Sequence, residues 1–106
     1  MSGADLSFEI LGFLVQVKLA DSSVARTRQF ERLVADVDEI VGCQSALGTV
    51  DYFLTIAASG VENYQRIIED LSSREAAKFE YATFPISKTL KTPFATPLPA
   101  SLAQRS

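Results

Sequence analysis

The order of two hydrophobic periodicities along the chain constrains its fold more than any other feature. Four segments are short apolar or alternating runs, which are typical of β-strands, and two carry apolar residues at helical spacing. The predicted strands are residues 10–19, 40–47, 51–58 and 78–90, and the predicted helices are residues 23–38 and 60–72. This order predicts an α+β fold, the ferredoxin-like βαββαβ sandwich, in which two helices cover one face of a four-stranded antiparallel sheet.

Local signals support these assignments. The first predicted helix has apolar residues at positions i, i+3, i+4 and i+7, from Phe30 to Val37. The second follows Ser59, with Glu62 three residues later, which is the pattern of a capping box. Pro85 lies within the last predicted strand. Because proline cannot donate to a ladder, we expect this strand at a sheet edge, beside the first strand.

One layer of helices leaves the second face of the sheet open. Depending on the register, the open face displays the following residues or those that alternate with them: Tyr52, Leu54, Ile56, Phe84 and Ile86. An exposed apolar sheet face is a candidate partner site, and two such sheets commonly pack face to face. The sequence therefore predicts a homodimer that forms through the sheet.

The residue types in the chain argue against catalysis. Its 106 residues, enough for one domain, include no His, no Trp and a single Cys. The chain thus lacks the usual proton shuttle and the usual nitrogen and sulfur ligands of zinc. We expect no enzyme activity, no cofactor and no metal site. Cys43, in a predicted strand with no basic neighbour in the sequence, is expected to be a small buried residue.

The charge balance argues against DNA binding by this chain alone. It has 10 basic and 13 acidic residues, a net charge of −3, whereas a DNA-binding surface needs clustered Lys and Arg. No basic segment precedes the first apolar stretch, and one Cys cannot form an internal disulfide. The uncharged run of residues 40–50 is shorter than the ~20 residues of a membrane span. We expect a cytoplasmic protein without membrane contact.

Residues 1–10 are expected to form a leader and residues 11–91 the folded domain. Residues 92–106 contain three prolines among small residues, which predicts a tail that is extended or partly disordered beyond Pro99.

Residues 43–52 read Cys-Gln-Ser-Ala-Leu-Gly-Thr-Val-Asp-Tyr and lead into the apolar residues 53–56. This stretch resembles the effector domain of the Lrp/AsnC family of feast/famine transcriptional regulators, in which a Gly-x-x-Asp-Tyr turn is typical. Further landmarks of that family occur in the same order: Phe30-Glu31, Tyr64, Thr83, Leu90-Lys91 and Pro97-Leu98-Pro99. The resemblance covers residues 12–99, and it depends on all landmarks falling in order on the predicted elements.

The resemblance implies a domain that binds an amino acid or a similar small metabolite where two dimers meet. Such domains dimerise through their sheets and assemble further, typically into a tetramer of dimers. Family members normally carry an N-terminal helix-turn-helix domain, but only about ten residues precede the first predicted strand. DNA contact is therefore expected only through a helix-turn-helix domain that this sequence lacks, whether the chain is excised or stands alone.

The resemblance also implies which residues contact the ligand. These are Leu47, Gly48, Thr49, Val50, Asp51 and Tyr52 of the hairpin and, from a neighbouring subunit, Thr83, Phe84 and Ile86 of the last strand.

Each turn residue also has a structural role to weigh against ligand contact. Gly48 is expected to adopt a positive φ. Asp51 either accepts backbone N–H groups or holds a ligand ammonium group, and Thr49 with adjacent N–H groups receives a carboxylate. Tyr52 and Tyr64 are more often packing residues. Family members often carry Asp and an aromatic residue at the two positions after the turn glycine, so the Thr and Val found here favour a small or apolar ligand, or none, over a basic amino acid.

Two alternative functions share this topology. One is a dimeric ferredoxin-like enzyme of the small monooxygenase or dehydratase kind, which usually depends on His, Trp or a bound haem. The other is an ACT-like regulatory module, which also binds amino acids. The Gly-x-x-Asp-Tyr turn and the Leu-Pro tail favour the Lrp/AsnC interpretation.

Overall fold

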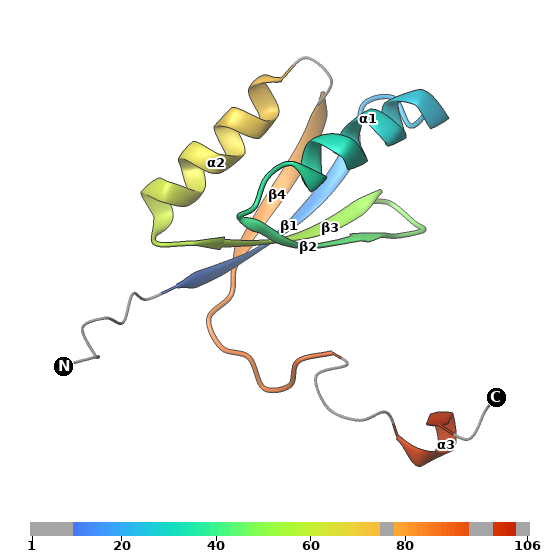
Figure 1. Cartoon of the computed structure of the whole chain (residues 1–106), viewed down its shortest axis with the longest axis vertical. Helices are drawn as coiled ribbons and strands as arrows, with labels where there is room; N and C mark the ends of the chain where they lie inside the picture. Colours follow the sequence, from blue (N-terminus) through green and yellow to red (C-terminus); the bar gives the residue numbers. More distant parts are fainter. Residues whose placement is uncertain (1–9, 75–77, 94–98, 104–106) are drawn as a thin grey trace.

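The computed structural model describes residues 10–74, 78–93 and 99–103, and the elements follow the predicted order. The strands are β1 (Leu11–Leu19), β2 (Ile40–Ser45), β3 (Tyr52–Ala58) and β4 (Phe79–Pro85), and the helices are α1 (Val24–Ala35), α2 (Val61–Ser73) and the short α3 (Ala100–Ala103). The strands form one antiparallel sheet in the order β2-β3-β1-β4, and α1 and α2 lie on the same face of it (Figure 1). This is the predicted ferredoxin-like fold.

The core lies between the sheet and the two helices. Alternate residues of β1 and β3 point into it, and they meet apolar residues of α1 and α2 that recur three or four positions apart. The main contributors are Phe13, Val15, Val17, Phe30, Leu33, Val34, Tyr52, Leu54, Ile56, Tyr64, Ile68 and Leu71. Full burial of one such aliphatic side chain contributes roughly 1.5–3 kcal/mol, so this cluster holds both helices on the sheet.

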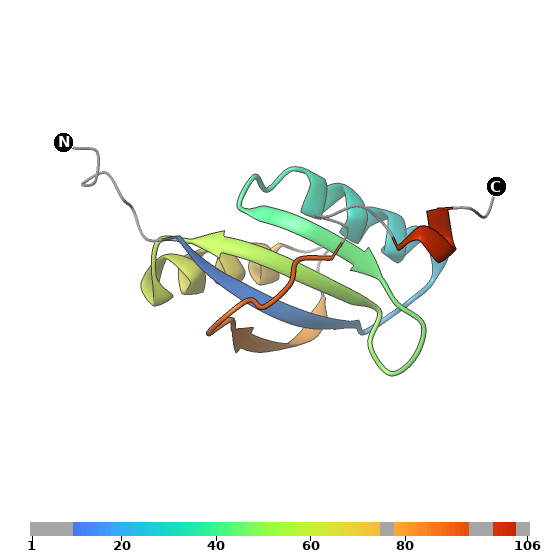
Figure 2. The same ribbon diagram turned by 90° about the horizontal axis from the view of Figure 1, so that it is seen from below.

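Neither α1 nor α2 covers the opposite face of the sheet, and Figure 2 shows this face from its own side, with the chain after β4 passing across the view. The register places Leu14 opposite Thr55 on β3 and opposite Phe84 on β4. It likewise places Gln16 between Phe53 and Ala82. Tyr52, Leu54 and Ile56 are buried under the helices, so the open face displays the residues that alternate with them, together with Phe84 and Ile86, which are 48% and 40% exposed.

β4 is an edge strand that pairs with β1, as its proline predicts. It ends at Pro85, five residues earlier than expected from the sequence pattern. One further hydrogen bond, from Ile86 N–H to the Gly12 carbonyl at 2.9 Å, continues beyond the strand. After it the chain leaves on the side of the sheet opposite to the helices (Figure 1).

The start of α2 differs from the predicted capping box. The N-cap is Gly60, and no side chain caps the helix there. Instead, Asn63 accepts a 2.9 Å hydrogen bond from the Ser59 backbone N–H through its side-chain oxygen. The helix begins one residue later than predicted. Asn63, and not Glu62, is therefore at the position from which a side chain can reach back to a backbone N–H group ahead of the helix.

Two further expectations were wrong. Cys43 is exposed rather than buried, because β2 lies at the edge of the sheet and neither helix covers the thiol fully. In the tail, residues 100–103 form α3 where an extended chain was expected. The rest of the predicted leader and tail, residues 1–9, 94–98 and 104–106, lies outside the described residues, so the boundaries of leader, domain and tail remain predictions. No helix in the described ranges has both the length and the apolar content to cross a membrane.

Candidate functional site

A hairpin loop joins β2 to β3 and projects beyond the end of the sheet (Figure 2). Its base is closed by a 2.9 Å hydrogen bond from the Ala46 N–H to the Asp51 carbonyl. Gly48 has φ +138°, a region that other residues rarely adopt, which confirms the predicted turn role. Leu47, Gly48 and Thr49 are exposed, and Val50 is half-buried. The loop therefore presents backbone groups and the side chains of Leu47 and Thr49 to its surroundings.

Asp51 fixes this loop to β1. Its backbone N–H donates to the Val17 carbonyl at 2.8 Å, and its side-chain Oδ2 accepts a hydrogen bond from the Leu19 N–H, also at 2.8 Å. The carboxylate was expected either to accept backbone N–H groups or to hold a ligand ammonium group. In the structure it accepts a backbone N–H group. The bond holds the hairpin in a defined position relative to the centre of the sheet.

Tyr52 belongs to the core rather than to an exposed site. Its side chain is 3% exposed, and its ring packs against Phe30 with centroids 4.9 Å apart. The hydroxyl donates a 2.5 Å hydrogen bond to Oε2 of Glu31 on α1. Burial, with the hydrogen bond and the negative charge of Glu31, raises the pKa of the Tyr52 phenol well above its ordinary value.

The three predicted site residues at the end of β4 lie on different faces. Thr83 points toward the helices, where its hydroxyl shares a hydrogen bond with the hydroxyl of Tyr64. Phe84 and Ile86 lie on the open face. Phe84 is opposite Leu14, roughly 13 Å along β1 from Lys18 at the hairpin end. A single chain therefore does not bring these residues together with the hairpin.

Sequence reasoning missed a depression of about 220 Å³ beside the hairpin. It is lined by Gln16, Lys18, Val50, Glu80, Tyr81 and Ala82, of which Val50 was predicted as a site residue. Lys18 and Glu80 are 62 positions apart in the sequence, and the β1–β4 register places them directly opposite each other. Only this register could have identified the pair.

A second depression lies between the end of α1 and the edge strand β2, with Cys43 and Glu31 among its lining residues. Partial burial, together with the charge of Glu31, raises the pKa of the Cys43 thiol. A raised pKa keeps the thiol protonated at neutral pH, which makes Cys43 a poor nucleophile. In the described part of the chain, no three His, Cys, Asp or Glu side chains are grouped to hold a metal ion.

Comparison with known proteins gives a consistent result. The chain is 32% identical over 82 residues to the transcriptional regulatory protein DoeX of Halomonas elongata, a match that covers 77% of this chain and 52% of DoeX. An AsnC family transcriptional regulator from Agrobacterium tumefaciens superposes with a TM-score of 0.73 at 15% identity, covering 92% of this chain and 62% of the regulator.

The transcriptional regulator NMB0573 of Neisseria meningitidis, solved as a complex with L-Met, gives a TM-score of 0.74 at 15% identity with the same coverage. The chain thus spans about half of its curated relative and somewhat under two thirds of these two structures. At such low identity, the structural matches establish the fold. Residues 13–95 match the family described as the Lrp/AsnC ligand binding domain. The chain therefore belongs to the Lrp/AsnC family through its ligand-binding domain.

Proposed function

We propose that this domain senses a small molecule of the amino-acid class and couples its binding to the assembly of a transcriptional regulator. Membership of the Lrp/AsnC family supports this role, as does the fold shared with a regulator solved as a complex with L-Met. The domain acts as a binding and oligomerisation module and not as an enzyme. DNA is contacted by another domain of the regulator, which fits the net charge of −3 on this chain.

The observation that carries the proposal is the open apolar face of the sheet. Leu14, Phe53, Phe84 and Ile86 lie on it, and neither α1 nor α2 covers them. Burying apolar surface contributes about 25 cal/mol per Å², so a second copy that packs its own open face here stabilises the pair. Each chain offers the same face, as a two-fold dimer requires.

The projecting hairpin supports assembly beyond the dimer. Its exposed tip, residues 47–49, lies far from Phe84 and Ile86 of the same chain, so a ligand that touches both groups must bridge two subunits. Tyr52 and Thr83 form hydrogen bonds within the chain. They would support ligand binding by holding the hairpin loop and β4 in position. A ligand that binds the assembled state more tightly shifts the association equilibrium by that difference in affinity.

Multi-angle light scattering on the chain, alone and with each standard L-amino acid, tests this function. We expect at least a dimer without ligand and a change in the mass distribution with one or a few of the amino acids. Phe84→Ser on the open face should favour the monomer. Val61→Ser serves as the control, because Val61 is 57% exposed on α2, away from the open face. A monomer that no amino acid affects would contradict the proposal.

A further inference from the structure

We propose that the depression beside the hairpin binds the main-chain groups of an amino acid whose side chain is uncharged. In this site the carboxylate of Glu80 takes the ligand ammonium group, and the ammonium group of Lys18 takes the ligand carboxylate. The inference rests on the proposed function and specifies which side chains recognise the ligand.

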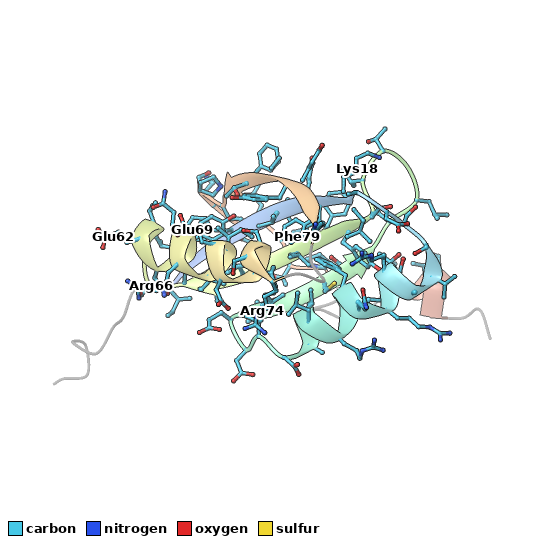
Figure 3. The ribbon with its side chains drawn as sticks, turned by 90° about the horizontal axis from the view of Figure 1, so that it is seen from above. Lys18, Glu62, Arg66, Glu69, Arg74 and Phe79 are labelled. Carbon is cyan, nitrogen blue, oxygen red and sulfur yellow. The ribbon has the colours of Figure 1, made fainter. Side chains whose placement is uncertain are left out.

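Two oppositely charged side chains lie next to each other in the sheet, beside the hairpin. Lys18 on β1 and Glu80 on β4 are directly opposite each other, where side chains leave the sheet about 4.5–5.5 Å apart at Cβ. Val17 and Leu19 are buried under the helices, and so the side chain between them belongs to the open face. Figure 3 shows Lys18 beside the hairpin loop. Both charges therefore stand at the rim of one depression, next to the loop.

The charges of Lys18 and Glu80 are not paired with each other. Within residues 10–74, 78–93 and 99–103, ion pairs within 4.0 Å join Arg26 to Asp21 and Arg74 to Asp70, and Lys18 and Glu80 do not form one. Two neighbouring side chains of opposite charge match the two opposite charges of a zwitterion. Because an exposed ion pair contributes little to stability, a ligand that enters between these groups displaces no strong interaction.

The other residues that line the depression are uncharged. Gln16, Val50, Tyr81 and Ala82 carry no charge at neutral pH, and Ala82 is small, which leaves space above the strand. Val50 comes from the hairpin, so a ligand held here also touches the loop that the family resemblance implicates. The lining offers no partner for a charged ligand side chain beyond the two groups that hold the main chain.

The position of the depression fits the assembly proposed above. The open face is apolar around Leu14 and Phe84 and becomes polar toward the hairpin, at Gln16, Lys18 and Glu80. A second sheet that packs on the apolar part would leave the polar end at the margin of the interface. A ligand there can contact both the loop of one chain and a neighbouring subunit.

Isothermal titration calorimetry on the full chain tests the site. The ligand is the standard L-amino acid that binds the wild type most tightly, starting with L-methionine. Lys18→Gln and Glu80→Gln should each weaken binding about tenfold, since each removes one charge-assisted contact. Arg66→Gln and Glu62→Gln on the exposed side of α2 (Figure 3) make the same kinds of charge change away from the depression and should leave affinity unchanged.

Ligand analogues identify which contact each residue makes. The α-amide of the amino acid lacks the carboxylate, so Lys18→Gln should change the affinity for this analogue little. The deaminated acid lacks the ammonium group, so Glu80→Gln should change the affinity for that analogue little. Melting curves of all variants check that they fold. If the wild type binds an amino acid and both variants bind it equally well, this inference is wrong and the proposed function stands. If the wild type binds none, both are wrong.

Discussion

The Asp51 side chain accepts the backbone N–H of Leu19 at 2.8 Å and thereby joins the end of the hairpin to the end of β1. The paired register of β1 and β3 stops at Val17 and Tyr52, so this bond extends the connection of the two strands beyond their ladder. Beyond the end of the ladder, the Asp51 carboxylate takes the place of the backbone carbonyl that would otherwise accept the Leu19 N–H. Together with the backbone hydrogen bond from Asp51 N–H to the Val17 carbonyl, this carboxylate orients the hairpin and with it the edge of the depression at Val50.

Asp51→Ala should lower the free energy of unfolding by about 1–3 kcal/mol, because it leaves a partly buried N–H without an acceptor. Asp51→Asn keeps an acceptor oxygen and should cost less than half as much. Urea denaturation monitored by circular dichroism measures both losses. Equal losses in the two variants would show that the negative charge, and not the acceptor, holds the loop.

Tyr52 should make stability depend on pH in the alkaline range. Its pKa is raised in the folded state, so its contribution is complete below the ordinary tyrosine pKa of about 10 and is lost as the pH rises toward the folded value. From about pH 10 upward, the free energy of unfolding of the wild type should fall more steeply than that of Tyr52→Phe, by up to about 1.4 kcal/mol per pH unit.

At neutral pH, Tyr52→Phe should cost about 1 kcal/mol through the lost hydrogen bond to Glu31. Urea denaturation across the pH range gives both quantities. Tyr64, whose pKa is also raised by burial, is present in both proteins and cancels in the comparison. Parallel curves for the two proteins would mean that Tyr52 ionises alike in the folded and unfolded chains.

Two glycines should respond oppositely to substitution. A Cβ at Gly48 meets no atom within 4 Å, yet its φ of +138° disfavours any side chain, so Gly48→Ala should cost about 1–3 kcal/mol. Gly60, the N-cap of α2, has an extended backbone, and a Cβ added there also meets no atom within 4 Å. Gly60→Ser should therefore stabilise the protein by about 0.5–1 kcal/mol through a new cap and a less flexible unfolded chain. Thermal unfolding of the two variants settles both signs.

The adjacent residues Thr83 and Phe84 should separate stability from assembly. Thr83→Val removes the hydrogen-bond partner of Tyr64 and should cost about 1 kcal/mol without changing the oligomer. Phe84→Ser changes the open face, and it should lower the mass of the oligomer by favouring the monomer. Adding Tyr64→Phe to Thr83→Val should cost less than the sum of the single losses, as expected for residues that interact directly. Denaturation and light scattering on the same samples distinguish the two effects.

The reactivity of Cys43 should depend on Glu31. Its negative charge contributes to the raised pKa of the thiol, after the larger effect of burial. Glu31→Gln keeps an acceptor for the Tyr52 hydroxyl but removes the charge, so the thiolate fraction at neutral pH should increase a few-fold. The rate of modification by a neutral maleimide measures this change. A rate that falls or stays constant would leave burial as the cause of the shift.

The fold could be predicted from the sequence because periodicity and element order determine it almost completely. The sequence could not predict which face of β3 is buried. Residues 52–57 read Tyr-Phe-Leu-Thr-Ile-Ala, and both alternating sets are mostly apolar. The buried set became known only through pairing with β1. The exposure of Cys43 was missed for a related reason, because strand order decides which strand is an edge.

The candidate site was predictable in part. The turn glycine and the loop around it follow from local sequence, since a positive φ is a local requirement. Lys18 and Glu80 belong to different strands and carry no local signal, so only the β1–β4 register brings them together. The separation of Thr83 from Phe84 onto opposite faces likewise depends on the pleat of the strand and not on residue type.

The strand order also decides how the domain responds to mechanical load. β1 is the one strand that enters the sheet directly from the N-terminal side, and it has a hydrogen-bonded neighbour on each flank, β3 and β4. A pull on the chain ahead of Leu11 is therefore resisted by two ladders at once, whereas a pull on β4 would meet one. A partner joined at that end would be held by a strand with two hydrogen-bonded neighbours, and it could transmit force into the centre of the sheet.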